Sequence, residues 1–293
     1  MMALIEPEIK EFDAPDPKGK GTHKIVYYQW GDDAAKEVIF CVHGLTRTGR
    51  DFDYLASALA SSKDVRVIAP DVAGRGKSQW LKKPSWYGYP TYMADMIALI
   101  KHLKLEKVKW VGTSMGGLIG ILIAAYHPRI ISKMVLNDIG PFIPKKSLNR
   151  LASYVGKDIN FKDMNDASKY LKTIMEGFGI TKEEHWNHIL KHTFILGSEA
   201  RYHFAYDPKI AAPFRNILGR PKKMPDMDFS EVWEKVDCPM FVIRGGDSDL
   251  LLRETSIEMK EHKFVEEVVE LPGIGHAPSL MEEEQIELIE KWL

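Results

Sequence analysis

Short apolar runs recur along the chain and alternate with segments whose apolar residues follow a helical period. The runs that we predict to be strands are Lys24–Trp30, Val38–Val42, Val65–Ala69, Val108–Val111, Met134–Leu136, Met240–Ile243 and Val265–Leu271. Several of them are apolar at consecutive positions, which is typical of strands buried on both faces of a parallel sheet. The pattern therefore predicts a mostly parallel sheet.

Helical periodicity fills several of the gaps between these runs. Phe52–Leu59 and Thr91–Leu103 carry apolar residues at steps of three and four, and Met115–Tyr126 is apolar almost all round and ends before Pro128. A chain that alternates strand and helix favours an α/β sheet with right-handed crossovers. We expect helices on both faces of that sheet.

The alternation stops after Asp138 and resumes at Cys238. Between them, residues 141–232 show helical patches, aromatic residues and methionines but no convincing buried strand. We interpret this segment as a helical cap that is inserted into a single α/β domain. The predicted organisation is a core formed by residues 1–140 and 233–293 and a cap formed by residues 141–232.

Composition narrows the class of protein without identifying it. The 293 residues are 45% hydrophobic and 28% charged, which is typical of a globular protein and argues against disorder or a coiled coil. The formal charge of −1 gives no electrostatic reason to expect a nucleic-acid or anionic-membrane partner. We expect a small molecule as the substrate and a monomer or homodimer as the assembly.

The cysteines, the N-terminal residues and the longest apolar stretch indicate in which cellular compartment to expect the protein. Cys41 and Cys238 lie in predicted buried strands, and two cysteines cannot form a disulfide framework. The N-terminal residues lack the basic and apolar regions of a secretory signal. The longest strongly apolar stretch, Leu118–Tyr126, is too short to span a bilayer. These features predict a cytoplasmic protein without membrane association.

The most informative motif is Gly112-Thr113-Ser114-Met115-Gly116, which follows a predicted buried strand and precedes an apolar helix. Gly-x-Ser-x-Gly in that context is typical of a nucleophile elbow, a tight turn that holds a serine in a strained backbone conformation. Side chains at positions 112 and 116 would collide with neighbouring chain, which explains the glycines. The serine hydroxyl then lies at a helix N-terminus, where N–H groups favour a developing negative charge.

A serine hydroxyl is a weak nucleophile until a base removes its proton, so Ser114 requires a histidine. The segment Gly275-His276-Ala277-Pro278 follows the last predicted strand and precedes a C-terminal helix. A histidine at that point agrees with the chain order of serine, acid and histidine that accompanies a nucleophile elbow. We therefore predict that His276 is the base.

Two carboxylates in one loop compete to be the acid that orients the histidine. Asp247 and Asp249 both follow the sixth predicted strand, and we prefer Asp249 because the two leucines after it can fold inward. A common spacing places the acid three residues after the strand-ending Gly245, and that position is Ser248. Asp138 ends the preceding predicted strand, near the position where some proteins that this motif order resembles carry the acid. It is a reserve candidate for the acid, and the interpretation that we prefer is that it fixes the hinge into the cap.

Acyl transfer also needs two donors for the oxyanion of its transition state. We predict the backbone N–H of Met115, directly after the nucleophile, and that of Leu45, in the loop after the second predicted strand. Gly44 allows this loop to approach the substrate oxygen. His43, Gly44 and Arg47 are candidate substrate-binding residues, with a structural hydrogen bond for His43 and a salt bridge for Arg47 as the alternatives.

Two other sequence patterns resemble ligand-binding sites, but we interpret neither of them as such a site. Gly76-Lys77-Ser78 resembles the end of a phosphate-binding loop, but Asp71 stands where that motif requires a glycine. His185, His188 and His192 fall on one face of a predicted helix, which we interpret as a solvated face because no His-Glu-x-x-His pattern is present. We therefore expect no metal and no organic cofactor.

The chain resembles the α/β-hydrolase superfamily in motifs that stand in that family's order. They are His43-Gly44, Asp71-Val-Ala-Gly74-Arg-Gly76-Lys-Ser78, Gly112-Thr-Ser114-Met-Gly116-Gly117 and Gly275-His276. The resemblance implies an eight-stranded, mostly parallel sheet with a cap inserted after the sixth strand. The segments Ser114-Met-Gly-Gly and Gly275-His276-Ala-Pro are similar to esterases, lactonases and carbon–carbon bond hydrolases. Haloalkane dehalogenases and epoxide hydrolases carry an aspartate where Ser114 stands, which argues against them.

These motifs lead to an expected reaction. We expect a serine hydrolase that cleaves a carboxylic ester or lactone of a small, largely apolar substrate through an acyl-enzyme. Hydrolysis of a carbon–carbon bond in a ring-cleavage product uses the same catalytic residues and is the nearest alternative. A small-molecule receptor with slow or no turnover, and an acyltransferase, are further alternatives.

Overall fold

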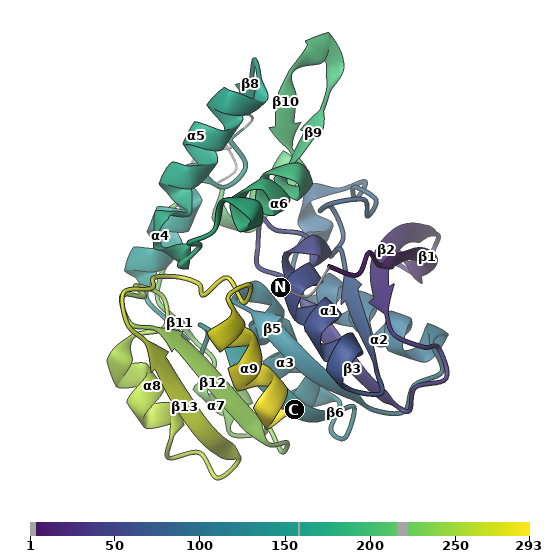
Figure 1. Ribbon diagram of the computed structural model, residues 1–293, viewed down its shortest axis with the longest axis vertical. Coiled ribbons are helices and arrows are strands. Elements are labelled where there is room, and N and C mark those ends of the chain that lie inside the picture. Colours follow the sequence, from purple (N-terminus) through teal and green to yellow (C-terminus); the bar gives the residue numbers. More distant parts are fainter. Residues whose placement is uncertain (1–3, 158, 216–221) are drawn as a thin grey trace.

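The computed structural model describes residues 4–157, 159–215 and 222–293, and an eight-stranded sheet runs through it (Figure 1). The strand order is β1-β2-β4-β3-β5-β6-β12-β13. The strands are β1 (Glu8–Pro15), β2 (Thr22–Trp30), β3 (Glu37–Val42), β4 (Val65–Pro70), β5 (Val108–Thr113), β6 (Ile131–Asn137), β12 (Met240–Gly245) and β13 (Val265–Leu271). The pairs β1–β2 and β2–β4 are antiparallel and all other pairs are parallel.

All the predicted strands are therefore present, together with β1, which no apolar run indicates. In β1 only Phe12 and Ala14 are buried, because this strand lies at the edge of the sheet and pairs with β2 alone. Because most residues of β1 are polar, the strand contains no apolar run that would indicate it. The predicted eight-stranded, mostly parallel sheet is confirmed.

Helices cover both faces of the sheet, as predicted. One face carries α1 (Asp53–Ser62) and α9 (Glu283–Trp292), and the other carries α2 (Tyr89–His102), α3 (Met115–Tyr126), α7 (Ser230–Trp233) and α8 (Arg253–Met259). Alternation along β3 divides the core between the faces: Phe40 packs with α2 and α3, whereas Ile39 and Cys41 pack with α1 and α9. This arrangement fixes the carboxyl ends of β3, β5 and β6 side by side.

The segment of residues 141–232, which we call the inserted segment, contributes none of its described residues to the large sheet. It contains β7 (Phe142–Ile143), α4 (Lys145–Tyr154), β8 (Asn160–Phe161), α5 (Met164–Ile174), α6 (Glu183–Thr193), β9 (Phe194–Leu196), β10 (Tyr202–Phe204) and β11 (Met227–Asp228). The helices α4, α5 and α6 lie above the sheet in Figure 1. The short strands pair as β8-β10-β9 and β11-β7, so the segment is not purely helical.

Short 3₁₀ turns complete the described structure. They are η1 (Gly49–Phe52), η2 (Pro84–Trp86), η3 (Glu176–Phe178), η4 (Ser198–Ala200) and η5 (Pro208–Phe214). Residues 1–3, 158 and 216–221, which fall within the predicted core and cap, lie outside the described residues. In the part of the chain that is described, no helix has both the length and the apolarity needed to cross a membrane.

Candidate active site

Ser114 occupies the sharp turn between β5 and α3, as the motif predicts. Its φ of 51° and ψ of −115° place it in a strained region of backbone conformation. A Cβ on Gly116 would lie 1.9 Å from the carbonyl oxygen of Val42, and one on Gly112 would lie 2.4 Å from the backbone nitrogen of Gly117. Neither distance is sterically possible, so the turn requires both glycines.

A chain of hydrogen bonds joins Ser114 to a histidine and a carboxylate. The Nε2 atom of His276 lies 2.8 Å from Oγ of Ser114, and its Nδ1 atom lies 2.6 Å from Oδ2 of Asp138. With Nδ1 protonated, Nε2 accepts the serine hydroxyl proton. The structure therefore brings the predicted nucleophile and base together, and it places Asp138, the reserve candidate, in the position of the acid.

The preference for Asp249 as the partner of His276 is wrong. Its carboxylate instead receives two hydrogen bonds from Arg150, from Nε and Nη2, both at 2.7 Å. Asp247 is exposed, and its backbone N–H donates to the carbonyl of Ile274. Leu250 and Leu251 do turn inward, but the backbone between them and the strand directs the Asp249 side chain toward the inserted segment.

Strand order explains why Asp138 reaches the histidine. It follows β6, which lies between β5, the strand of the nucleophile, and β12. The Asp138 carboxylate is fully buried, accepts the N–H of Gly245 at 2.8 Å and accepts the hydroxyl of Ser248. One donor is the last residue of β12 and the other lies in the loop after it, so the region that was expected to supply the acid supplies hydrogen bonds to the acid.

Sequence reasoning missed the roles of Asn137 and Ser248. The Asn137 side chain donates to Thr113 Oγ1 at 3.0 Å and to the carbonyl of Pro278 at 2.9 Å. It thereby links the strand before Ser114 to the segment that carries His276. For Ser248 a signal was present, because a serine at the expected position of the acid indicates that the acid lies elsewhere.

The loop after β3 and the start of α3 have the backbone groups expected of an oxyanion hole. Among the described residues, the N–H groups of Leu45 and Met115 donate to no other group of the chain. Both residues line a cavity that also contacts Ser114. The guanidinium of Arg75, fully buried, donates from Nε to the Leu45 carbonyl at 2.9 Å and so fixes this loop.

His43 has a structural position. It is fully buried, its Nδ1–H donates to the Gly44 carbonyl at 2.7 Å, and its Nε2 accepts the N–H of Val72 at 3.0 Å. Burial lowers the pKa of His43 to about 4, so the ring stays neutral at neutral pH. Because both ring nitrogens already bind backbone groups, the structure does not bring His43 to a substrate-binding position.

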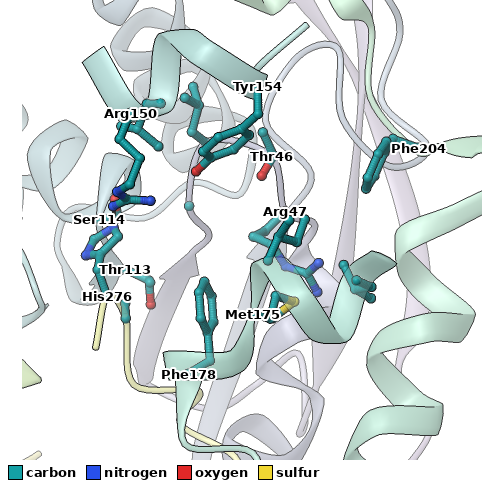
Figure 2. A pocket seen from close by; sticks show the side chains of 16 residues that line it. Thr46, Arg47, Thr113, Ser114, Arg150, Tyr154, Met175, Phe178, Phe204 and His276 are labelled. Carbon is teal, nitrogen blue, oxygen red and sulfur yellow. Dashed lines mark hydrogen bonds between the residues drawn. The ribbon is translucent and has the colours of Figure 1, made fainter. Parts of the chain in front are cut away.

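A cavity of about 90 Å³ opens beside Ser114 and His276 (Figure 2). Gly44 and Arg47, two of the candidate substrate-binding residues, line it. Arg47 donates to Asp51 through Nε and Nη2 and to Thr193 through Nη1, so each of its three nitrogens already has a partner. The cavity also has Thr46, Thr113, Arg150, Tyr154, Met175, Phe178 and Phe204 in its wall. Much of this wall is apolar, but it includes the side chains of two arginines and His276, and for this reason we call it the polar cavity.

A second cavity, of about 210 Å³, meets the first at Ser114. Its other lining residues are Leu45, Gly88, Tyr89, Tyr92, Met115, Ile139, Ile143, Leu148, Leu151, Ile210, Pro213, Phe214, Met224, Met227 and Leu250. We call it the apolar cavity. The inserted segment contributes several lining residues to each of the two cavities. Part of the aromatic and methionine content of that segment therefore faces Ser114.

The interpretation of the α6 histidines as a solvated face is wrong. His185 is buried and its Nδ1 lies 3.0 Å from Oε1 of Glu282. His188 is 8% exposed in its side chain and its Nε2 lies 2.9 Å from the carbonyl of Arg50. These histidines face α1 and the loops of the large sheet, which helical periodicity alone cannot distinguish from a face in water.

Comparisons with known proteins agree on the fold. A family model described as alpha/beta hydrolase fold matches residues 37–282. A 3-hydroxybutyrate-oligomer hydrolase of Cupriavidus necator is 42% identical over 271 residues, which are 91% of each protein. A solved alpha/beta hydrolase of Novosphingobium aromaticivorans is 33% identical, with a TM-score of 0.84 over 99% of this chain and 98% of that one. The solved E-2-(acetamidomethylene)succinate hydrolase, at 18% identity and a TM-score of 0.78, shares the fold.

Proposed function

The chain belongs to the α/β-hydrolase family, and we propose that it hydrolyses a carboxylic ester through an acyl-enzyme on Ser114. The observation that carries this proposal is the hydrogen-bonded chain of Ser114, His276 and Asp138, with distances of 2.8 and 2.6 Å. A serine with a base in reach and an acid behind the base is the arrangement that acyl transfer needs.

In the proposed reaction His276 takes the proton of Ser114 as the hydroxyl oxygen attacks the ester carbonyl. The N–H groups of Leu45 and Met115 stabilise the oxyanion, and buried Asp138 stabilises the imidazolium. The imidazolium then returns its proton to the leaving alcohol as the carbon–oxygen bond breaks. A water molecule, deprotonated by His276, attacks the acyl-enzyme, and the serine oxygen leaves with that proton as the acid is released.

The two cavities suggest how an ester would lie across Ser114. His276 lines the polar cavity and not the apolar one. Because the histidine must reach the leaving oxygen, we place the alcohol portion in the polar cavity. The acyl chain then enters the apolar cavity, whose wall offers Tyr89 and Tyr92 as its polar side chains besides Ser114.

We further propose short oligoesters of hydroxy acids as the substrate class. The support is the 42% identity with a 3-hydroxybutyrate-oligomer hydrolase and the position of Arg150 in the polar cavity. Arg150 directs Nε and Nη2 to Asp249 and also forms a side-chain hydrogen bond with Tyr154, which leaves part of its five N–H donors for another acceptor. The free carboxylate of a leaving hydroxy acid is such an acceptor.

Arg150 also favours a second candidate reaction. A carbon–carbon bond hydrolase acting on a ring-cleavage product would use the same Ser114 and His276 and would need a cation for the substrate carboxylate. The two candidates differ in the bond broken, so an assay of ester dimers beside ring-cleavage products distinguishes them.

The inserted segment would act as a lid in either reaction. Two contacts support this role: Arg150 and Ser147, both on α4, bind the side chain and the backbone carbonyl of Asp249. They hold α4 over the cavity that contains the nucleophile. A closed lid excludes water while the ester is positioned.

The test is labelling with a fluorophosphonate together with turnover of short p-nitrophenyl esters. We expect both in the wild-type protein, neither in Ser114→Ala, and both in Ser153→Ala, which changes an exposed serine of α4. Labelling that survives in Ser114→Ala would reject Ser114 as the nucleophile. Labelling without turnover of any ester would favour the receptor alternative.

A further inference from the structure

A second group of ligand-type side chains lies between α1 and α6, away from both cavities. One carboxylate oxygen of Asp53 and one ring nitrogen each of His188 and His192 lie within 4.8 Å of one another. Asp53 is the first residue of α1, and the two histidines are one turn apart on α6. Histidines at positions i and i+4 of a helix present their rings on one face, a spacing that suits a shared metal ion.

We propose that Asp53, His188 and His192 bind a divalent transition-metal ion of the Zn²⁺ class and so tie the inserted segment to the large sheet. Within the described residues, His192 Nε2 is a buried polar atom without a hydrogen-bond partner. Buried polar atoms are rarely left in this state, because desolvation without a replacement bond is costly. A metal ion would supply the missing partner.

The donor set fits such an ion. Two imidazole nitrogens and one carboxylate oxygen are typical zinc ligands, and they leave a fourth tetrahedral position for water. The rings of His188 and His192 lie 4.7 Å apart at their centroids. His188 Nε2 is 3.5 Å from Oδ2 of Asp53, so a small convergence of the three side chains brings them to coordination distance.

A neighbouring arginine holds the Asp53 carboxylate in place. Arg50 Nε donates to both oxygens of Asp53, at 2.9 and 2.7 Å, and Arg50 Nη2 also reaches Glu6 at 3.0 Å. A hydrogen-bond donor behind a ligating carboxylate is a common second partner in metal sites. The positive charge of Arg50 opposes the ion, and Glu6 offsets part of that charge. His188 must also exchange its contact with the Arg50 carbonyl for the metal, its proton moving to Nδ1.

The proposed ion has no part in the hydrolytic steps. None of its three ligands lines either cavity at Ser114. Its effect is mechanical, since α1 packs on the large sheet and α6 belongs to the inserted segment. A bound ion would oppose separation of these two helices and hold the segment over the nucleophile.

The experiment is a titration of chelator-treated, full-length protein with Co²⁺, whose visible absorption reports tetrahedral coordination. We expect saturation at one Co²⁺ per chain and displacement by Zn²⁺. His188→Gln and His192→Gln should each weaken Co²⁺ binding by at least about tenfold. His127→Gln, which changes an exposed histidine after α3, should bind as the wild type does.

A second measurement separates loss of binding from loss of folding. Zn²⁺ should raise the midpoint temperature of the wild type and of His127→Gln but not that of His192→Gln, with circular dichroism showing that each variant is folded before metal is added. The proposal is overturned if the wild type shows no saturable tetrahedral spectrum. It is equally overturned if that spectrum persists with unchanged affinity in His192→Gln.

Discussion

The hydroxyl of Ser248 donates a hydrogen bond to the carboxylate of Asp138, which is the partner of His276. The two residues end up in contact although they follow different strands, β6 and β12. Ser248 stands where a common spacing expects the acid, and Asp138 is the carboxylate that fills that place in space. The carboxylate that reaches His276 therefore follows β6, and the residue at the corresponding point after β12 is a hydroxyl that donates to it.

This relationship predicts different effects for two aspartate substitutions. Asp138→Asn should lower kcat by about 10³- to 10⁴-fold, because an amide does not stabilise the imidazolium and favours the wrong ring tautomer. Asp249→Asn should change kcat by less than about tenfold, since it removes only a partly exposed ion pair. Steady-state turnover of a p-nitrophenyl ester measures both, and the reverse ranking would return the role of acid to Asp249.

The apolar cavity predicts a limit on the acyl chain. Leu148→Trp adds bulk to its wall, so kcat/KM for an octanoyl ester should fall by about tenfold or more relative to an acetyl ester. Ile174→Trp is the matched control, because Ile174 lines the polar cavity instead. If both variants keep the chain-length profile of the wild type, the acyl group does not occupy the apolar cavity.

Arg150 should distinguish a charged leaving group from a neutral one. For a hydroxy-acid dimer with a free carboxylate, Arg150→Gln should raise KM by about 10- to 100-fold, which is the usual worth of a hydrogen bond to a charged group. The methyl ester of the same dimer should show little change. Arg47→Gln serves as the comparison, since each nitrogen of Arg47 already has a partner in Asp51 or Thr193. Equal losses on both dimers would mean that Arg150 only supports the lid.

Because His43 is buried, we predict that the free energy of unfolding decreases as the pH falls. Burial lowers the pKa of His43 to about 4, against about 6.5 in the unfolded chain, so the unfolded state takes up the proton first as the pH falls. This group's contribution is complete above about pH 6.5 and is lost progressively down to pH 4.

Urea unfolding at pH 7 and pH 4.5 measures the effect. His43 should account for roughly 2 kcal/mol of the difference in free energy of unfolding between these two pH values. The variant His43→Gln, which has no titrating side chain, should show a difference smaller by that amount. An identical pH dependence in the variant and the wild type would contradict the assignment of a buried, neutral ring.

The proposed nucleophile and the proposed base could be predicted from the sequence because each lies in a short motif with local physical requirements. Gly112 and Gly116 are needed by the turn itself, and His276 follows the last strand of the sheet. The acid depends instead on which strand end faces the histidine in space. That choice requires the lateral order of β5, β6 and β12, which no local pattern encodes.

The same distinction applies to the fold and to α6. Strands buried on both faces are marked by consecutive apolar residues, whereas the edge strand β1 is not. The periodicity of α6 places His188 and His192 on one face, but only packing against α1 shows that this face is covered. The short strands of the inserted segment are two or three residues long and leave no periodic signal.

Neighbouring residues of the β12 loop face opposite ways: Ser248 bonds to Asp138, the proposed acid, and Asp249 binds Ser147 and Arg150 of α4. Lifting α4 away requires breaking the bonds to Asp249. That disturbance arises one residue from the hydroxyl that steadies Asp138. The contacts that hold the proposed lid and the contact that supports the proposed acid therefore lie on adjacent residues of a single loop.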